Sequence, residues 1–212
     1  MRRSQLLRAA EPRLMPVPEA EWDDDARPII ETAAAHNGGR VFNVLSTMAR
    51  YPKLLKRWNV FGNHVLTRST LPARERELAI LRTGYVAHSG YEWAQHVDMA
   101  RGVGCTDDEI ERVAAGPDAA GWSEADRAIL RATDELLGDH FVSDATWNAL
   151  CNCWSEHQIL DLVFAVGQYS LVSMPLNTLG VQIEEGVELF PPSLFNQGYF
   201  GHGRMVEPTV EP

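Results

Sequence analysis

The chain has 212 residues, of which 45% are hydrophobic and 23% are charged, and its formal net charge is −10. This acidic balance argues against a nucleic-acid partner, because no basic stripe is present to neutralise phosphates. No run approaches the roughly 18 apolar residues that cross a bilayer, and the first 13 residues are too sparsely apolar for a secretory signal, so we expect a soluble cytoplasmic protein without a membrane partner.

Apolar residues recur at spacings of three and four along most of the chain, which predicts helices. The length suffices for one well-buried core, or for two small domains that share one. After an arm rich in proline and acidic residues (1–24), the first four helices are expected over 27–36, 41–50, 53–66 and 73–87. No alternating run predicts a strand, so we expect an all-α protein of about eight helices.

The starts of the later helices are marked by hydroxyl residues. Ser89, Thr106 and Ser155 are each followed three positions later by Glu or Gln, the pattern of a capping box, and Ser123 and Ser143 begin two more helices. The segments ELAILRTG (77–84) and RAILRATD (127–134) share the letters AILR. Either a duplicated two-helix unit or two helices with similar faces would explain this likeness.

The segment 187–212 differs from the predicted helical domain (25–186). It has four prolines and three glycines, and its aromatic residues Phe190, Phe195, Tyr199 and Phe200 follow no helical period. A disordered tail is poor in aromatic residues. We therefore predict an assembly arm that packs on a neighbouring subunit.

The chain has three cysteines, Cys105, Cys151 and Cys153, and they form neither a CxxC pair nor a disulfide framework. We expect each of them to behave as a small buried hydrophobe. The seven histidines are scattered without an HExxH motif. We therefore predict no metal site.

The segment SGYEWAQH, residues 89–96, is the first candidate for a catalytic site along the chain. Helical spacing places Ser89, Glu92 and His96 on one face. A capping box explains Ser89 and Glu92 without chemistry, but it explains neither His96 nor Glu77 on the preceding helix. The apolar surroundings suggest burial, and a buried Glu/His pair must be hydrogen-bonded or functional. The residues leave two interpretations open, a helix cap or a proton-transfer site.

The stretch LPARERELAILRTGYVAHSGYEWAQHVDMARGVGCTDDEI resembles the core of the carboxymuconolactone decarboxylase family, within the alkylhydroperoxidase-D-like superfamily. The resemblance extends over roughly residues 40–185, through YPKLLKRWNVFG, SEADRAILRATDELL and VGQYSLVSMPLNTLGV. It implies an AhpD-like helical bundle that forms a homotrimer or homohexamer.

The peroxidase branch of that superfamily carries a glutamate, a CxxC pair and a histidine. In this sequence these positions are Glu77, Ser89, Glu92 and His96. Both thiols are missing, and peroxide reduction needs a thiolate. The decarboxylase branch is similar at Glu92 and His96. The resemblance therefore implies a longer YEWxxH-type member that is not a thiol peroxidase.

The resemblance implies cofactor-free proton transfer, decarboxylation or isomerisation, on a small carboxylated or lactone-like molecule of the kind met in aromatic-compound catabolism. It makes His96 the proton donor, Glu92 and Glu77 the groups that orient and charge it, and Ser89 a substrate contact. Other expected substrate contacts are Tyr85, Trp93, Arg82 and His88, and Arg74 and Arg76 are further candidate cations. These arginines could equally be solvated or paired with Glu75 and Glu77.

A second class of function stays open, a non-catalytic oligomer that binds a hydrophobic small molecule in the same pocket. Such a binder has no need for two carboxylates near a histidine, and burying them without use costs stability. This consideration favours the enzyme.

Overall fold

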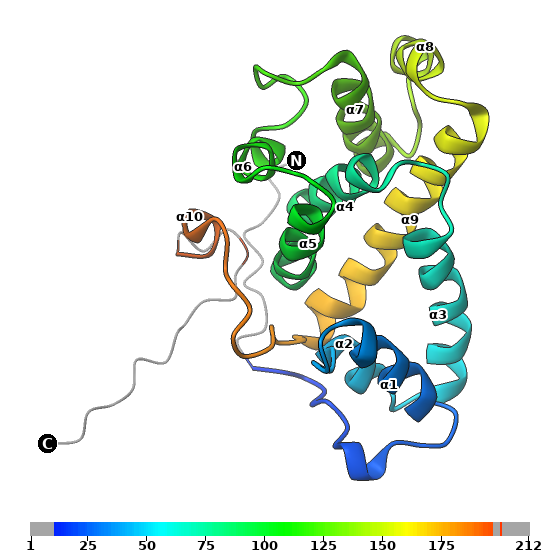
Figure 1. Ribbon diagram of the computed structural model, residues 1–212, viewed down its shortest axis with the longest axis vertical. Helices are drawn as coiled ribbons and strands as arrows, with labels where there is room; N and C mark the ends of the chain where they lie inside the picture. The colour runs from blue at the N-terminus through cyan, green and yellow to red at the C-terminus, as the bar shows by residue number, and fades with distance from the viewer. Residues whose placement is uncertain (1–10, 197–199, 201–212) are drawn as a thin grey trace, which may run out of the picture.

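The computed structural model describes residues 11–196 and Phe200, and within them it contains helices and no strand. The helices are η1 (Glu19–Glu21), α1 (Arg27–His36), α2 (Asn43–Met48), α3 (Pro52–Thr67), α4 (Ala73–Val86), α5 (Gly90–Gly102), α6 (Asp107–Ala115), α7 (Glu124–Asp139), α8 (Asp144–Cys153), α9 (Glu156–Leu179) and α10 (Pro192–Asn196) (Figure 1). Eight of the α-helices in this part of the chain have nine or more residues. The predicted all-α class is confirmed.

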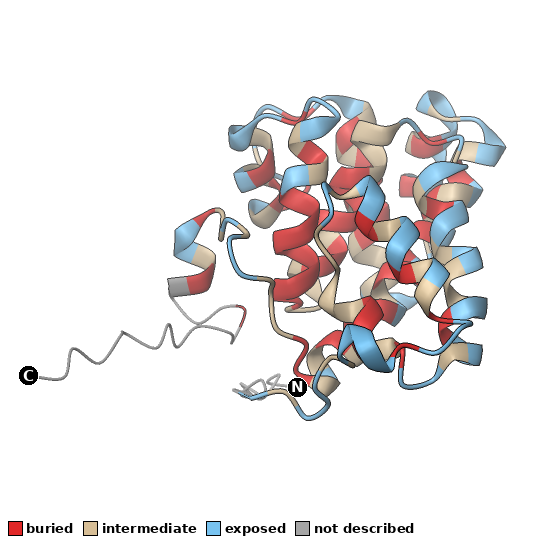
Figure 2. Ribbon diagram, turned by 60° about the horizontal axis from the view of Figure 1, so that its bottom comes forward, coloured by how far each residue is buried: buried red, intermediate tan, exposed pale blue. Residues whose placement is uncertain are grey.

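Helix α4 lies at the centre of the bundle and packs against α5, α6, α7 and α9. Buried residues concentrate along the inner helices, and the outer faces are exposed (Figure 2). Gly84 brings α4 close to α5, since a Cβ there would lie 3.4 Å from the backbone nitrogen of Trp93. The two AILR segments fall on α4 and α7, which are packed neighbours. This close packing fixes the relative positions of the side chains on α4 and α5.

Two of the three predicted capping boxes are present. Thr106 and Glu109 exchange side-chain-to-backbone hydrogen bonds at the start of α6, and Ser155 and Gln158 do so at the start of α9. Ser123 and Ser143 also cap their helices, as expected. Each bond satisfies an amide that the helix itself leaves free.

The third predicted capping box, at Ser89, is wrong. Ser89 precedes α5, but its side chain accepts no capping bond. Its hydroxyl is fully buried and has no hydrogen-bond partner among the described residues. The Glu92 side chain instead lies 3.0 Å from His96. A charged imidazole is a stronger partner for a carboxylate than a backbone amide is, which explains why the local sequence signal failed.

The described part of the C-terminal segment packs on its own chain. The indole of Trp93 donates a 2.6 Å hydrogen bond to the carbonyl of Phe190. Phe195 and Phe200 are buried in the same cluster as Trp93 and Val97. Residues 197–199 and 201–212 lie outside the described residues, and the contact with a neighbouring subunit stays a prediction.

Helix α9 departs from the expectation that no segment is apolar enough to cross a bilayer. Its 24 residues satisfy length and composition criteria for a membrane span, although half of its apolar window is buried within this protein. The core helix of a soluble protein meets the same criteria. Its outer face carries Leu160, Phe164, Leu171 and Met174, each more than half exposed.

We call these four residues the α9 stripe. They are separated by four, seven and three positions, which is typical of a helix that packs against another helix. Phe61 of α3 extends the stripe, with its ring 6.1 Å from that of Phe164. Exposed apolar residues grouped on one helix face can mark a protein–protein contact. A second copy of the chain, presenting the same stripe, is the occupant we expect.

The caps supply a first prediction. Ser155→Ala should lower the free energy of unfolding by about 1 kcal/mol, because it deletes a capping bond. Ser89→Ala should show no such loss, because the hydroxyl it deletes makes no bond to a described residue. Chemical denaturation of the two variants measures both values. An equal loss in both would mean that Ser89 caps α5 after all.

The α9 stripe supplies a second prediction. Leu171→Glu should shift the protein to a smaller species in light scattering, whereas Trp147→Glu, at an exposed site on α8, should not. The wild-type mass expected in light scattering is that of a trimer or a hexamer, the assemblies implied by the family resemblance. A wild-type monomer in solution, or one that binds lipid vesicles through this face, would contradict self-association.

Candidate active site

Three buried ionisable side chains form one row between α4 and α5. Glu77 Oε2 lies 2.6 Å from His96 Nδ1, and Glu92 Oε1 lies 3.0 Å from His96 Nε2. The exposed fractions of Glu77, His96 and Glu92 are 2%, 4% and 6%. Glu92 and His96 share one face of α5, and α4 presents Glu77 from the other side. The predicted catalytic residues are therefore in direct contact.

The row keeps His96 charged. Burial alone would lower the pKa of His96, but the negative charges of Glu77 and Glu92 and their hydrogen bonds outweigh it and raise the pKa to about 10. At neutral pH both ring nitrogens therefore carry protons, and each donates to one carboxylate. Arg76 lies on the far side of Glu77, with Nε 3.8 Å from the second carboxylate oxygen.

Tyr169 of α9 packs against the imidazole of His96. Its ring lies edge-on to His96, with the two centroids 4.8 Å apart. Burial, followed by the charges of Glu92 and Glu77, raises the pKa of Tyr169 well above its usual value. The phenol therefore stays neutral and keeps its proton.

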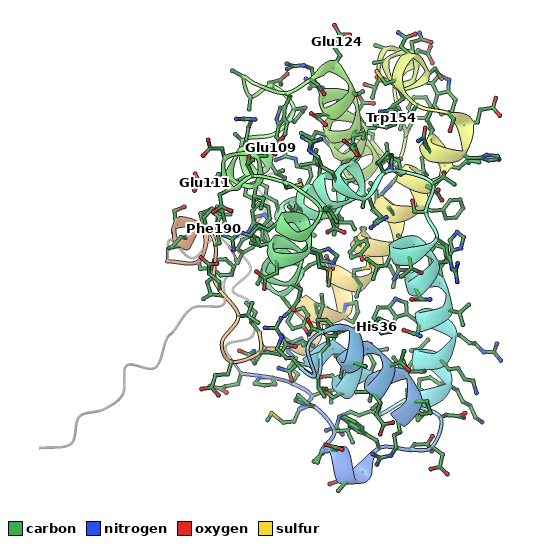
Figure 3. All side chains as sticks on the ribbon, viewed as in Figure 1. His36, Glu109, Glu111, Glu124, Trp154 and Phe190 are labelled. Atoms are coloured by element: carbon green, nitrogen blue, oxygen red, sulfur yellow. The ribbon has the colours of Figure 1, made fainter. Side chains whose placement is uncertain are left out.

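The row borders a cavity of about 640 Å³. Glu92, His96 and Tyr169 belong to the cavity wall, whereas Glu77 lies behind them. Helices α1, α2, α3, α5 and α9 build the wall, and His36 of α1 is labelled in Figure 3. Its apolar residues are Pro28, Ile29, Ala33, Phe42, Val44, Leu45, Trp58, Leu66, Met99 and Val172. Its volume suits a small organic molecule.

The five predicted substrate contacts lie outside this wall. Arg82 donates to both oxygens of Asp134 and to the carbonyls of Val113 and Ala114, which ties α4 to α6 and α7. Arg74 is likewise held by Glu75, Glu109 and Asp126. The pairing with Glu75 that the sequence left open is observed for Arg74, whereas Arg82 pairs with Asp134.

The remaining predicted contacts lie around the start of α5. Trp93 is fully buried and faces the C-terminal segment. Tyr85 packs between Trp93 and Phe200. His88 adopts a left-handed backbone, with φ of 52°, in the turn between α4 and α5. Together with Ser89, these residues shape the start of α5 and do not reach the cavity wall.

Sequence reasoning missed the residues that α3 and α9 bring to the cavity. Trp58 and Asn59 come from α3, and Gln168 and Tyr169 come from α9. These positions are far from SGYEWAQH in the chain, so no local spacing connects them to it. A usable signal was the pair Gln168-Tyr169, two polar side chains on the buried face of an otherwise apolar helix.

Glu184 holds the cavity side of α5 in place. Its Oε1 accepts a 2.6 Å bond from the hydroxyl of Tyr91 and a 2.5 Å bond from the backbone nitrogen of Asn43. Its Oε2 accepts from Gln95. Burial and the charge of Glu184 raise the pKa of Tyr91 well above its usual value. Glu184 thus connects the loop after α9 to two residues of the cavity wall.

The cysteines lie apart from this wall. Cys105 is buried, and burial, against the opposing charge of Arg74, raises the pKa of its thiol to about 12. Cys151 and Cys153 are exposed on α8, so the expectation of burial is wrong for these two. Among the described residues no group of three or more His, Cys, Asp or Glu side chains is arranged to hold a metal ion.

Comparison with solved structures shows an AhpD-like fold. An uncharacterized peroxidase-related protein from Ralstonia eutropha JMP134, described as an alkylhydroperoxidase AhpD core, superposes with a TM-score of 0.74 at 23% identity, over 83% of this chain and 95% of that one. A similar protein from Silicibacter sp. TM1040 gives 0.73 at 17%, over 84% and 94%. The debrominase Bmp8, in a complex with 2,3,4-tribromopyrrole, gives 0.69 at 14%, over 81% and 91%.

No curated protein matches the chain in sequence. The model of the carboxymuconolactone decarboxylase family matches residues 52–135, the segment that supplies Glu77, Glu92 and His96. By this match residues 52–135 are similar to the carboxymuconolactone decarboxylase family, and the helical fold of the chain is AhpD-like.

Proposed function

We propose that the protein is a proton-transfer enzyme that acts on a small organic molecule bound in the cavity. One observation carries the proposal: a buried carboxylate, imidazolium and carboxylate form a continuous row whose last member, Glu92, belongs to the cavity wall. Perturbed ionisable groups at a cavity of this size are characteristic of acid/base sites.

Glu92 is the group that meets the substrate. Both nitrogens of His96 are occupied by carboxylates, so the imidazole has no free position for a ligand. Glu92 has a second oxygen, and it accepts a proton from a substrate carbon. His96 supports the carboxylate with a charge-assisted hydrogen bond, and Glu77 holds His96 from behind. These roles differ from the expectation that His96 donates the proton directly.

The chemistry that follows is a proton shift within the substrate. A C–H bond breaks as the O–H bond of Glu92 forms, and Glu92, after exchange of this proton with water, gives a proton to a different carbon, which yields an isomer. The neutral phenol of Tyr169 would stabilise the enolate oxygen formed between the two proton transfers.

A thiol peroxidase mechanism is not part of the proposal. Ser89 and Glu92 stand at the positions of the two redox cysteines in the related branch, and the high pKa of Cys105 leaves its thiol protonated. The names of the peroxidase-related neighbours and of the debrominase describe those proteins, and their likeness to this chain concerns the fold.

The competing function is a non-catalytic binder, and the apolar wall of the cavity favours it. The two functions differ in what Glu92 does. A binder would keep its affinity for a ligand when Glu92 becomes Gln and would turn nothing over. An enzyme would keep the affinity and lose the turnover.

The test uses an enol-lactone in deuterated water. Conversion of α-angelica lactone into β-angelica lactone moves one proton between ring carbons, and NMR detects both the product and the deuterium it gains. Glu92→Gln should slow this conversion by roughly a hundredfold or more, because it removes the proton acceptor and keeps the shape. His96→Gln should slow it as well, since the charge that supports Glu92 is lost.

The control is Glu111→Gln, which removes an exposed carboxylate on α6, remote from the cavity (Figure 3). It should convert the lactone at the wild-type rate. Equal rates in wild type, Glu92→Gln and His96→Gln would end the proposal. Circular dichroism at the assay temperature confirms that each variant is folded.

A further prediction concerns pH. With a pKa of about 10, against about 6.5 in an unfolded chain, His96 should stabilise the fold fully below pH 6.5 and lose this contribution as the pH rises toward 10. Nitrogen-15 NMR should show both ring nitrogens protonated at pH 8. The difference in unfolding free energy between wild type and His96→Gln should shrink from pH 6 to 10. Titration of His96 near 6.5 would contradict the charged row.

A further inference from the structure

The charges around the cavity are already matched. No arginine or lysine belongs to the cavity wall. Two members of the row, Glu92 and His96, belong to the wall. His96 is shared by two carboxylates, and Arg76 lies beside Glu77. The row and Arg76 together carry two formal positive and two formal negative charges. No arginine or lysine of the wall is therefore available to an anionic ligand, and the other histidine of the wall, His36, has its Nδ1 2.7 Å from the carbonyl oxygen of Thr32.

Two further arginines near the row, Arg74 and Arg82, cannot supply a cation without breaking other contacts. Arg74 is engaged by three carboxylates, and Arg82 by Asp134 and two backbone carbonyls. A ligand carboxylate in this cavity would give up its hydration beside Glu92 and gain no ion pair. Burial of an unpaired charge is strongly unfavourable.

Two polar groups of the wall lack partners. The indole nitrogen of Trp58 is a buried donor, and Oε1 of Gln168 is a buried acceptor, and neither has a hydrogen-bond partner among the described residues. The amide of Gln168 rests against α3 at Gly62, where a Cβ would lie 3.3 Å from its Nε2. Buried polar atoms are rarely left unpaired, and both residues belong to the cavity wall, so a molecule bound there can supply the missing partner after a small shift of either side chain.

We propose that the substrate of this site is an uncharged, largely apolar ring compound with a carbonyl or hydroxyl group, recognised by Trp58 and Gln168. The inference rests on the proposed function for its reaction and names the substrate class of the same cavity. It replaces the carboxylated substrate expected from the family resemblance with a neutral one. The ring contacts the apolar wall, and its polar group satisfies the unpartnered atoms.

The test compares matched neutral and anionic probes by calorimetry. Three pairs are titrated: methyl benzoate and benzoate, indole and indole-2-carboxylate, and the methyl ester and free carboxylate of 5-oxo-2,5-dihydrofuran-2-ylacetic acid. At least one neutral member should bind at least tenfold more tightly than its carboxylate. Carboxylates that bind as tightly as their partners, or a cavity that binds no neutral member, would overturn the inference.

A cation added to the wall gives the converse measurement. Asn63 lies on α3 in the wall and is exposed. Asn63→Arg should raise the affinity for the carboxylates at least tenfold, and the neutral control Asn63→Gln should not. Unchanged preference in Asn63→Arg would mean that charge does not select ligands here.

The role of the unpartnered groups is tested with Gln168→Leu and Trp58→Phe, which remove one polar group each and keep most of the packing. Either change should weaken binding of the neutral probe by about tenfold, roughly the scale of one hydrogen bond. Asn148→Leu, at an exposed site on α8, is the matched control. Unaltered affinity in both variants would refute the assigned contacts.

These binding measurements are independent of turnover. A preference for neutral probes without lactone conversion would support the substrate class and contradict the proposed reaction. Lactone conversion with a preference for carboxylates would support the reaction and contradict the substrate class.

Discussion

The pairing of His96 with two glutamates is the interaction on which the rest of the site depends. Each of the three side chains is less than a tenth exposed, and each alone would be costly to bury. Together they satisfy one another, with both imidazole nitrogens donating to carboxylates. The arrangement works only if α4 and α5 stay in register, and the close approach at Gly84 meets that requirement. Removal of one member would leave an unpaired buried charge.

The sequence predicted the members of this row and the class of the fold. Glu92 and His96 follow from their spacing on one helix, whereas Glu77 needed the family resemblance, because the contact between α4 and α5 has no local signature. The helices themselves follow from apolar periodicity and capping residues. The Ser89 box failed because a local rule cannot foresee that His96, one turn further on, competes for Glu92.

The cavity wall could not be predicted from spacing. Its residues come from five helices, and only α5 carries the recognised motif. The same limit applies to the aromatic C-terminal segment. An irregular run of rings indicates that the segment packs against something, but composition does not distinguish the chain's own core from a neighbour. In the structure, Phe195 and Phe200 pack in the same cluster as Trp93, within the same chain.

The family resemblance aligns Ser89 and Glu92 with the two redox cysteines of the peroxidase branch, and we propose that this difference changes the chemistry of the scaffold. A thiol pair needs a thiolate that is poised to attack sulfur or oxygen. In the proposed function, the Glu92 carboxylate, joined to the His96 imidazolium, is a proton acceptor beside a mostly apolar cavity instead. The electrostatic interactions of the row with a bound molecule are stronger where that molecule displaces water from the cavity. In the proposed reaction, a neutral ring compound enters the cavity without the cost of desolvating a charge. Its acidic C–H bond then lies against the carboxylate of Glu92.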